Sequence, residues 1–244
     1  MYKNMNPKLI MYAIELENVT YYYPDGSLGV KDVTIRIKRG EKVALIGSNG
    51  CGKSTTLLLM AGLIEPEFGV VKIFEKDIKT WDKSSLRKTI GILFQNPDDF
   101  LFNPTVKEEL LYTPAQLDIP FEEALNMVKN YAKMFNLERI LNKPPFRLSS
   151  GEKKKVALAC VIMLNPQILL LDEPTTNIDG RTRKKILSII EEFEGTLVLA
   201  THELDIATQI VDRVIILGMN KTILADGDVS LLEDKVLLEK ASII

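Results

Sequence analysis

The chain has few cysteines, a single histidine and no excess of charge of either sign. Its 244 residues include two cysteines, so it could form at most one disulfide, which excludes a disulfide-stapled secreted scaffold. Lys and Arg number 31 against 33 for Asp and Glu, so the basic excess that binds nucleic-acid backbones is missing. We therefore expect a protein of the reducing cytoplasm with no nucleic-acid partner.

Long apolar runs are also missing. The best of them, residues 156–164, has nine residues, whereas a membrane-spanning helix needs about 20. Residues 1–11 carry two lysines without an apolar segment, so we expect no signal peptide. The composition, 46% hydrophobic and 26% charged, is that of a folded soluble protein, so any membrane part is expected from other chains.

Short, wholly apolar runs recur along the chain and are typical of strands buried on both faces of a parallel sheet. These runs are residues 43–46, 90–94, 168–171, 197–200 and 214–217. Between them lie segments with helical spacing, such as residues 183–194. Residues 33–38 instead alternate apolar and polar side chains, which indicates a strand with one wet face. Strands that alternate with helices predict an α/β fold with a parallel sheet.

The middle of the chain departs from this rhythm, because residues 97–154 contain no strand-like run. Within it, residues 122–135 carry the apolar stripe of an amphipathic helix. We predict a helical insertion here, which divides an α/β core into residues 12–96 and 155–230. The tail, residues 231–244, alternates charged side chains with Leu and Val and predicts a final helix.

A glycine-rich loop follows the first buried strand and fits the phosphate-binding pattern G-x-x-x-x-G-K-[ST]. Its glycines permit close approach of the backbone to an anion, and successive N–H groups at a helix N-terminus favour phosphate. We expect Lys53 to reach the β- and γ-phosphates and Ser54 to ligate Mg²⁺. Because Cys51 lies inside the loop, we also expect thiol alkylation to block turnover. The expected nucleotide-binding residues of this phosphate loop are Gly47, Ser48, Asn49, Gly50, Cys51, Gly52, Lys53, Ser54 and Thr55.

Two carboxylates follow the buried run 168–171. Asp172 and Glu173 should emerge at the carboxyl edge of the sheet, where ligands of open α/β sheets bind. Asp172 is suited to hold Mg²⁺, directly or through water, and Glu173 to polarise an attacking water as general base. Together with the phosphate loop, they predict an ATPase that uses ATP and Mg²⁺.

The segment Leu148–Glu152, LSSGE, resembles the LSGGQ signature of ABC-transporter ATPases. Ser150 and Glu152 depart from the family pattern, whereas Ser149 and Gly151, which the family aims at the γ-phosphate, are retained. The resemblance covers residues 12–230. It implies a P-loop NTPase core with a mainly parallel sheet, an N-terminal antiparallel β subdomain and an inserted α-helical signature subdomain. It also implies an ATP-driven dimer in which the signature of one chain caps nucleotide bound to another, identical or paralogous, chain.

Other residues of the chain match further motifs of the family, in the same order along the sequence. The resemblance implies that Gln95 senses Mg²⁺ and the γ-phosphate, that Asp179 crosses the dimer interface and that His202 is the switch histidine. It also implies that Tyr23 stacks on adenine, with Tyr22 as the alternative because a slip of one residue exchanges the faces of a strand. The implied catalytic set is Lys53, Gln95, Glu173 and His202, and the implied metal set is Ser54, Gln95 and Asp172.

Residues 95–106, QNPDDFLFNPTV, are similar to a segment of the ATPases of energy-coupling-factor transporters, which import cobalt, nickel and vitamins; Phe100 stands where that branch has glutamine. The resemblance implies an importer subunit at the cytoplasmic face of the membrane, docked on a transmembrane coupling protein. Asp98 and Asp99 are the expected acceptors of an arginine from that protein, or else a solvated turn after Pro97. The alternatives are the ATPase of another transporter branch and a non-transport ABC ATPase.

Overall fold

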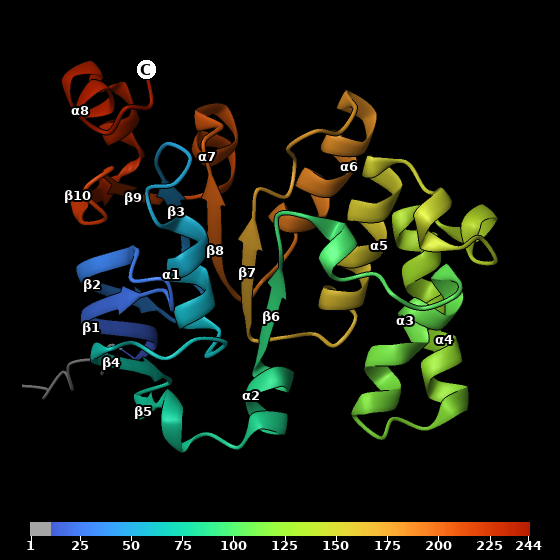
Figure 1. Cartoon of the computed structure of the whole chain (residues 1–244). Coiled ribbons are helices and arrows are strands. Elements are labelled where there is room, and N and C mark those ends of the chain that lie inside the picture. Colours follow the sequence, from blue (N-terminus) through green and yellow to red (C-terminus); the bar gives the residue numbers. More distant parts are fainter. Residues whose placement is uncertain (1–10) are drawn as a thin grey trace, which may run out of the picture.

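The structure, a computed structural model, describes residues 11–244 and contains two β-sheets. The smaller sheet is antiparallel, with strand order β2-β1-β4-β5 (Figure 1). Its strands are β1 (Tyr12–Tyr22), β2 (Leu28–Lys38), β4 (Phe68–Ile73) and β5 (Lys76–Asp77). Residues 33–38 alternate between buried and exposed along β2, as expected from their pattern. This sheet is the antiparallel N-terminal subdomain that the family resemblance implied.

The larger sheet has the order β10-β9-β3-β8-β7-β6. Its strands are β3 (Lys42–Ile46), β6 (Ile90–Leu93), β7 (Ile168–Asp172), β8 (Thr196–Thr201), β9 (Arg213–Leu217) and β10 (Ile223–Asp228). All pairs are parallel except that of β10 with β9. The heads of the arrows β6, β7 and β8 therefore meet at one edge (Figure 1), and the segments that follow these strands are brought together there.

The described part of the chain contains eight α-helices. They are α1 (Lys53–Met60), α2 (Lys83–Thr89), α3 (Val106–Gln116), α4 (Phe121–Phe135), α5 (Ser150–Ile162), α6 (Gly180–Glu191), α7 (Leu204–Ile210) and α8 (Lys235–Lys240). Alternate residues of the central strands enter two different cores. Leu169 and Leu171 pack with α5 and α6, whereas Ile168 and Leu170 pack with α1 and the antiparallel sheet. Burial on both faces explains why these strands are wholly apolar.

All regular secondary structure of the predicted insertion is helical, and the insertion stands to one side of the sheet (Figure 1). Residues 97–154 contain α3, α4, the beginning of α5 and three single-turn 3₁₀ helices, at Pro97–Asp99, Glu138–Ile140 and Pro145–Arg147. The amphipathic stripe of α4 packs on the core through four buried residues, Ala124, Val128, Ala132 and Phe135. Helix α5 then runs from Ser150 to Ile162, so one rigid helix joins the insertion to the core across residue 154.

The tail differs from the single final helix that its pattern suggested. It holds a 3₁₀ turn at Val229–Glu233 and only the short α8. The two are separated at Asp234, whose carboxylate accepts a hydrogen bond from Leu237 N at 3.0 Å and so starts a new helix. Leu238 and Ala241 anchor this helix on the core. Across residues 11–244, no helix combines the length and apolar character that crossing a bilayer requires.

Candidate functional site

The phosphate loop joins β3 to α1 and is shaped by glycines. A Cβ on Gly47 would meet Cys51 Sγ at 2.5 Å and the Leu217 carbonyl oxygen at 2.7 Å, so no side chain fits there. Gly52 has a φ of 109°, and a Cβ on it would lie 2.8 Å from the Gly29 carbonyl oxygen. The loop therefore folds tightly and ends at the N-terminus of α1, where the backbone N–H groups and the helix dipole favour an anion.

The side chain of Lys53 is buried against this loop. Its Nζ donates to the carbonyl oxygens of Gly47 at 2.7 Å and Ser48 at 3.2 Å. The same Nζ lies 3.8 Å from Oε1 of Glu173. The ammonium group thus sits between the loop and the catalytic candidate, and it has flexible donors that can turn to phosphate oxygens.

Asp172, the last residue of β7, carries a carboxylate oxygen that lacks a partner. Its Oδ1 is buried and has no hydrogen bond within the described part of the chain. Burial raises the pKa of the Asp172 carboxyl, while the hydroxyl of Ser54 acts in the opposite direction on that pKa. A buried carboxylate with one unpaired oxygen, beside a hydroxyl, fits Mg²⁺, which binds one or two protein oxygens together with water and phosphates. Residues 11–244 hold no cluster of three or more His, Cys, Asp or Glu side chains for a metal, so the phosphates would have to complete such a site.

Glu173 follows Asp172 and is almost completely buried, with 2% of its surface exposed. Its Oε1 lies 2.9 Å from Nδ1 of His202, and its Oε2 accepts hydrogen bonds from the hydroxyls of Thr176 at 3.0 Å and Thr201 at 3.3 Å. Three side chains from two segments, the one after β7 and the one at the end of β8, therefore fix the orientation of this carboxylate. A general base that is held in place in this way needs little reorganisation to act on a water molecule.

A cavity of about 570 Å³ connects these groups. Residues 49–50 and 52–55 of the phosphate loop line it, together with Gln95, Asp172 and Glu173. The sequence-predicted catalytic and metal candidates thus gather around one cavity, with His202 reaching it through Glu173. Lys221, from the turn between β9 and β10, also lines it. No sequence motif marks that turn, so sequence reasoning missed Lys221.

Tyr22 ends β1 and Tyr23 follows it, and of these two tyrosines Tyr23 is the one at the cavity. Its Oη lies 2.7 Å from Oγ1 of Thr55, and its ring packs edge-on against Tyr21. Tyr22 is 41% exposed and does not line the cavity. This geometry favours Tyr23 over Tyr22 for contact with a base.

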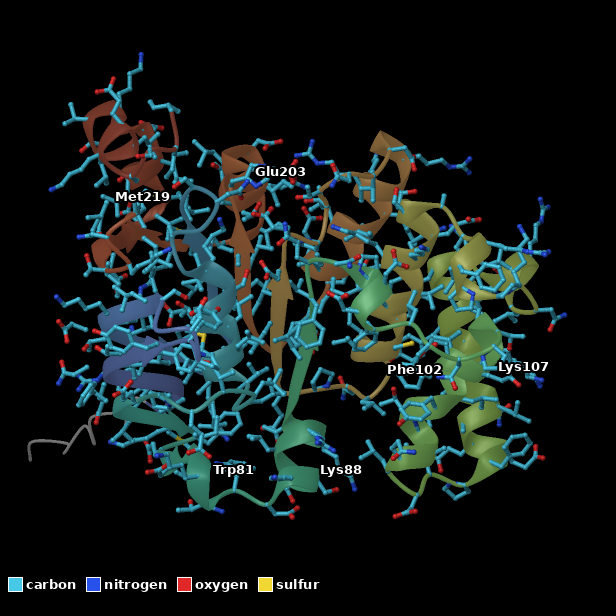
Figure 2. All side chains as sticks on the ribbon, viewed as in Figure 1. Trp81, Lys88, Phe102, Lys107, Glu203 and Met219 are labelled. Carbon is cyan, nitrogen blue, oxygen red and sulfur yellow. The ribbon has the colours of Figure 1, made fainter. Side chains whose placement is uncertain are left out.

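Cys51 lies in the phosphate loop but does not line the cavity. The side chain is fully buried and its Sγ lies beneath Gly47, away from the cavity. Burial also raises the pKa of the Cys51 thiol, which lowers the fraction of reactive thiolate. A reagent would therefore reach this thiol only if the loop opened, and the expected block of turnover by alkylation stays a prediction. Above it, Ser48 Oγ contacts Sδ of Met219 at 3.1 Å (Figure 2 labels Met219).

Ser149, Gly151 and Asp179 lie outside the cavity of their own chain. Ser149 caps α5: its hydroxyl accepts from Glu152 N at 3.3 Å, and Glu152 Oε2 accepts from Ser149 N at 2.9 Å. Asp179 caps α6 and accepts from the backbone N–H groups of residues 181 and 182. A Cβ on Gly151 would come within 3.1 Å of Thr182. Glu152, which stands where the family has glutamine, thus has a local role in capping.

Asp98 and Asp99 form part of a 3₁₀ turn after Asn96 and are both exposed. Asp98 Oδ1 lies 2.5 Å from Nζ of Lys153 on α5, so this acid already has a cationic partner. Asp99 lines a groove of about 280 Å³. Phe102, also in that groove, lies beside the helices of the insertion (Figure 2). The two acids, which we expected to act together, therefore have different surroundings: Asp98 pairs with Lys153, whereas Asp99 lines the groove.

Comparisons with known proteins agree with these observations. The family model described as ABC transporter matches residues 30–176. A putative ABC transporter ATP-binding protein of Archaeoglobus fulgidus is 53% identical over 95% of this chain and 98% of its own length. The energy-coupling factor transporter ATP-binding protein EcfA of Methanocaldococcus jannaschii is 40% identical over 89% of this chain and 79% of its own.

The chain is also similar to solved structures of ABC transporter proteins. The cbiO1 protein of Clostridium perfringens, described as part of the ABC transporter complex cbiONQ, matches with a TM-score of 0.79 and 32% identity. The match covers 96% of this chain and 95% of cbiO1. A dimeric post-hydrolysis state of the ATP-binding cassette MJ0796, bound to ADP and Pi, matches with a TM-score of 0.79 and 30% identity over 88% of this chain and 98% of that one.

Proposed function

The chain belongs to the ABC transporter family and is an ATPase, and we propose that it powers an importer of the energy-coupling-factor type for a metal ion or a vitamin. Relatives named energy-coupling factor ATPases, and the likeness to cbiO1, support this branch. The observation that carries the catalytic assignment is the buried carboxylate of Glu173, held 2.9 Å from His202 beside the cavity that Lys53 enters.

In the proposed reaction, the triphosphate lies along the phosphate loop. Lys53 moves from its carbonyl partners to the β- and γ-phosphates, where its charge is stabilised by the phosphate oxygens. Ser54, Gln95 and Asp172 would hold Mg²⁺, which when bound neutralises charge on the β- and γ-phosphate oxygens. The ring of Tyr23 covers the adenine end of the cavity.

Hydrolysis is the attack of one water molecule on the γ-phosphorus. The water oxygen forms a bond to phosphorus, its proton passes to the carboxylate of Glu173, and the bond to the β-phosphate oxygen breaks to release ADP. His202 and the threonines that hold Glu173 keep the base directed at the water. Because the surrounding charges and dipoles are already oriented, little reorganisation is needed in the transition state.

Each chain is proposed to carry half of two ATP sites. Ser149 and Gly151 stand at the N-terminus of the 13-residue helix α5, outside their own cavity, where they can meet the γ-phosphate on a second chain. Asp179 would lie across the same interface. The dimers known for the relative MJ0796 support this assembly. The closed dimer then forms when the γ-phosphate is present and opens after hydrolysis, because the phosphate favours one of the two states.

The membrane partner is proposed to dock in the groove between β6, α5 and the helical insertion. Phe100, Phe102 and Tyr112 give this groove an apolar lining, and Asp99 adds a carboxylate. The loop that carries Phe102 is fixed by the buried Glu109, whose carboxylate accepts from the N–H groups of Phe102 at 2.9 Å and of the next residue at 2.7 Å. A preformed apolar groove of this kind suits a short helix of a transmembrane coupling protein at the cytoplasmic face of the membrane.

Two experiments test this proposal. The first is a pull-down from solubilised membranes: a vitamin- or metal-binding membrane protein among the captured chains supports the importer, whereas a different carrier protein supports another transporter branch. The second reverses both acids. Asp98→Arg with Asp99→Arg should release the membrane partner while nucleotide binding persists, and Glu122→Arg, exposed on α4, is the matched control. An unchanged pull-down with the double variant contradicts this docking mode.

A further inference from the structure

Lys154 is a buried lysine that the proposed reaction does not use. It lies in the first turns of α5, three residues beyond Gly151, and only 5% of its surface is exposed. Its Nζ donates a hydrogen bond of 2.5 Å to the backbone carbonyl oxygen of Glu173. Lysines are rarely buried to this extent unless their charge is paired.

The surroundings of Lys154 are acidic. Burial lowers the pKa of the Lys154 ammonium, and the nearby carboxylates of Glu173, Glu203 and Asp172 act against that change, in this order of size. Figure 2 shows Glu203 at the end of the sheet where β7 and β8 finish. Lys154 therefore brings a positive charge to the acidic edge of the sheet from a helix that begins in the signature segment (Leu148–Glu152).

The backbone of Glu173 has an unfavourable conformation that needs support from neighbouring segments. Its φ is 47°, in the left-handed region that residues with a side chain seldom adopt. The N–H of Glu173 donates to the carbonyl oxygen of Ala200 on β8 at 2.9 Å, and its carbonyl oxygen accepts from Lys154 on α5. Hydrogen bonds to β8 and to α5, the helix that begins in the signature segment, thus fix the backbone of Glu173 on both sides.

Neighbouring residues of α5 extend this connection. Ser150, the departure from the family glycine, donates from its hydroxyl to the carbonyl oxygen of Asn177 at 2.8 Å, close to Asp179. Lys153 pairs with Asp98 on the segment after Gln95. The beginning of α5 is therefore tied to two segments, the one between β7 and α6 and the one that follows Gln95.

We propose that Lys154 is a positioning residue that ties the signature helix to the catalytic carboxylate Glu173 of the same chain. The inference rests on the proposed function, in which Glu173 is the general base and the signature segment caps nucleotide on a second chain. Under that arrangement, Lys154 connects the two ATP sites of a dimer, because the helix that docks at one site holds the base of the other. Lys154 acts through Glu173 and does not itself touch nucleotide.

The test is a double-substitution cycle on the full chain. Lys154→Met removes the charged donor and keeps the length of the side chain, and Lys154→Arg keeps a charged donor. Lys155→Met is the matched control, because it is the same substitution at the next residue of the same helix. Each is made in the wild type and in Glu173→Gln, and the readouts are kcat, KM for ATP, the melting temperature and ATP-induced dimerisation.

We expect Lys154→Met to lower kcat by about 10- to 100-fold, the loss typical of a misplaced catalytic group, with KM for ATP changed less than about twofold. Lys154→Arg should keep more of the kcat, and Lys155→Met should keep nearly all of it. In the Glu173→Gln background, Lys154→Met should slow the residual turnover no further and should leave ATP-induced dimerisation in place, because the group through which Lys154 acts is already gone.

Three results would overturn the inference: an unchanged kcat in Lys154→Met, a loss of dimerisation in the double variant, or the same fold-loss in both backgrounds. If Glu173→Gln alone leaves turnover at the wild-type rate, it is the proposed role of Glu173 that fails, so the two failures can be told apart.

Discussion

Replacing Glu173 by glutamine is the sharpest perturbation that this site offers. The amide has almost the same shape and can stay within reach of His202, Thr176 and Thr201, so the fold should persist. It cannot accept a proton from water as a carboxylate does. General-base catalysis contributes about 10²- to 10⁴-fold, so kcat should fall by that factor, or about 3–5 kcal/mol in the barrier.

The affinity for ATP, unlike kcat, should not fall in this variant. In the structure, Lys53 Nζ lies 3.8 Å from Oε1 of Glu173, and the glutamine removes that competing negative charge. The ammonium is then freer to turn to the phosphates, so affinity for ATP should be equal to or higher than that of the wild type, and the ATP-bound dimer should accumulate. Phosphate release under saturating ATP and titration with a fluorescent nucleotide measure the two effects. Turnover close to the wild-type rate in Glu173→Gln would refute the assignment of the base.

Three further substitutions separate the other roles. Lys53→Ala should weaken ATP binding by about tenfold or more, because it deletes a charged donor to phosphate, and a titration with unchanged affinity would contradict this. Tyr23→Ala should raise KM for ATP by about fivefold or more through loss of stacking, whereas Tyr22→Ala should change it little; equal effects would count against Tyr23. Asp172→Asn should raise the melting temperature of the nucleotide-free protein by a few degrees, since a buried charge with an unpaired oxygen is lost, and should abolish the response of turnover to Mg²⁺; a lower melting temperature would argue against that reading of Asp172.

Much of the fold could be predicted because its strands are buried on both faces. Runs such as residues 168–171 and 197–200 are wholly apolar for that reason, and each became a strand of the parallel sheet. The phosphate loop was readable for a related reason, since close backbone approach at Gly47 and Gly52 leaves no room for other residue types. Where tertiary contacts allow only a few residue types at a position, the structure there can be predicted from the sequence.

The parts that could not be predicted depend on contacts between distant segments. Nothing in the sequence indicates that the amine of Lys154 reaches the carbonyl oxygen of Glu173 or that Lys221 lines the cavity, because each contact depends on the packing of a helix or a turn against the sheet. The burial of Cys51 beneath Gly47 was missed because the pattern gives the order of loop residues and not the side on which a side chain lies. The break of the tail at Asp234 is a local capping event that the alternation of charge and apolar residues conceals.

The structure of the Glu173→Gln variant with Mg²⁺ and ATP would test the shared active site most directly. We predict a dimer in which the triphosphate lies in the phosphate loop of one chain, with its γ-phosphate within hydrogen-bond reach of Ser149 of the other. A nucleotide-bound dimer in which Ser149 and the phosphate loop lie far apart across the interface would contradict the proposed mechanism.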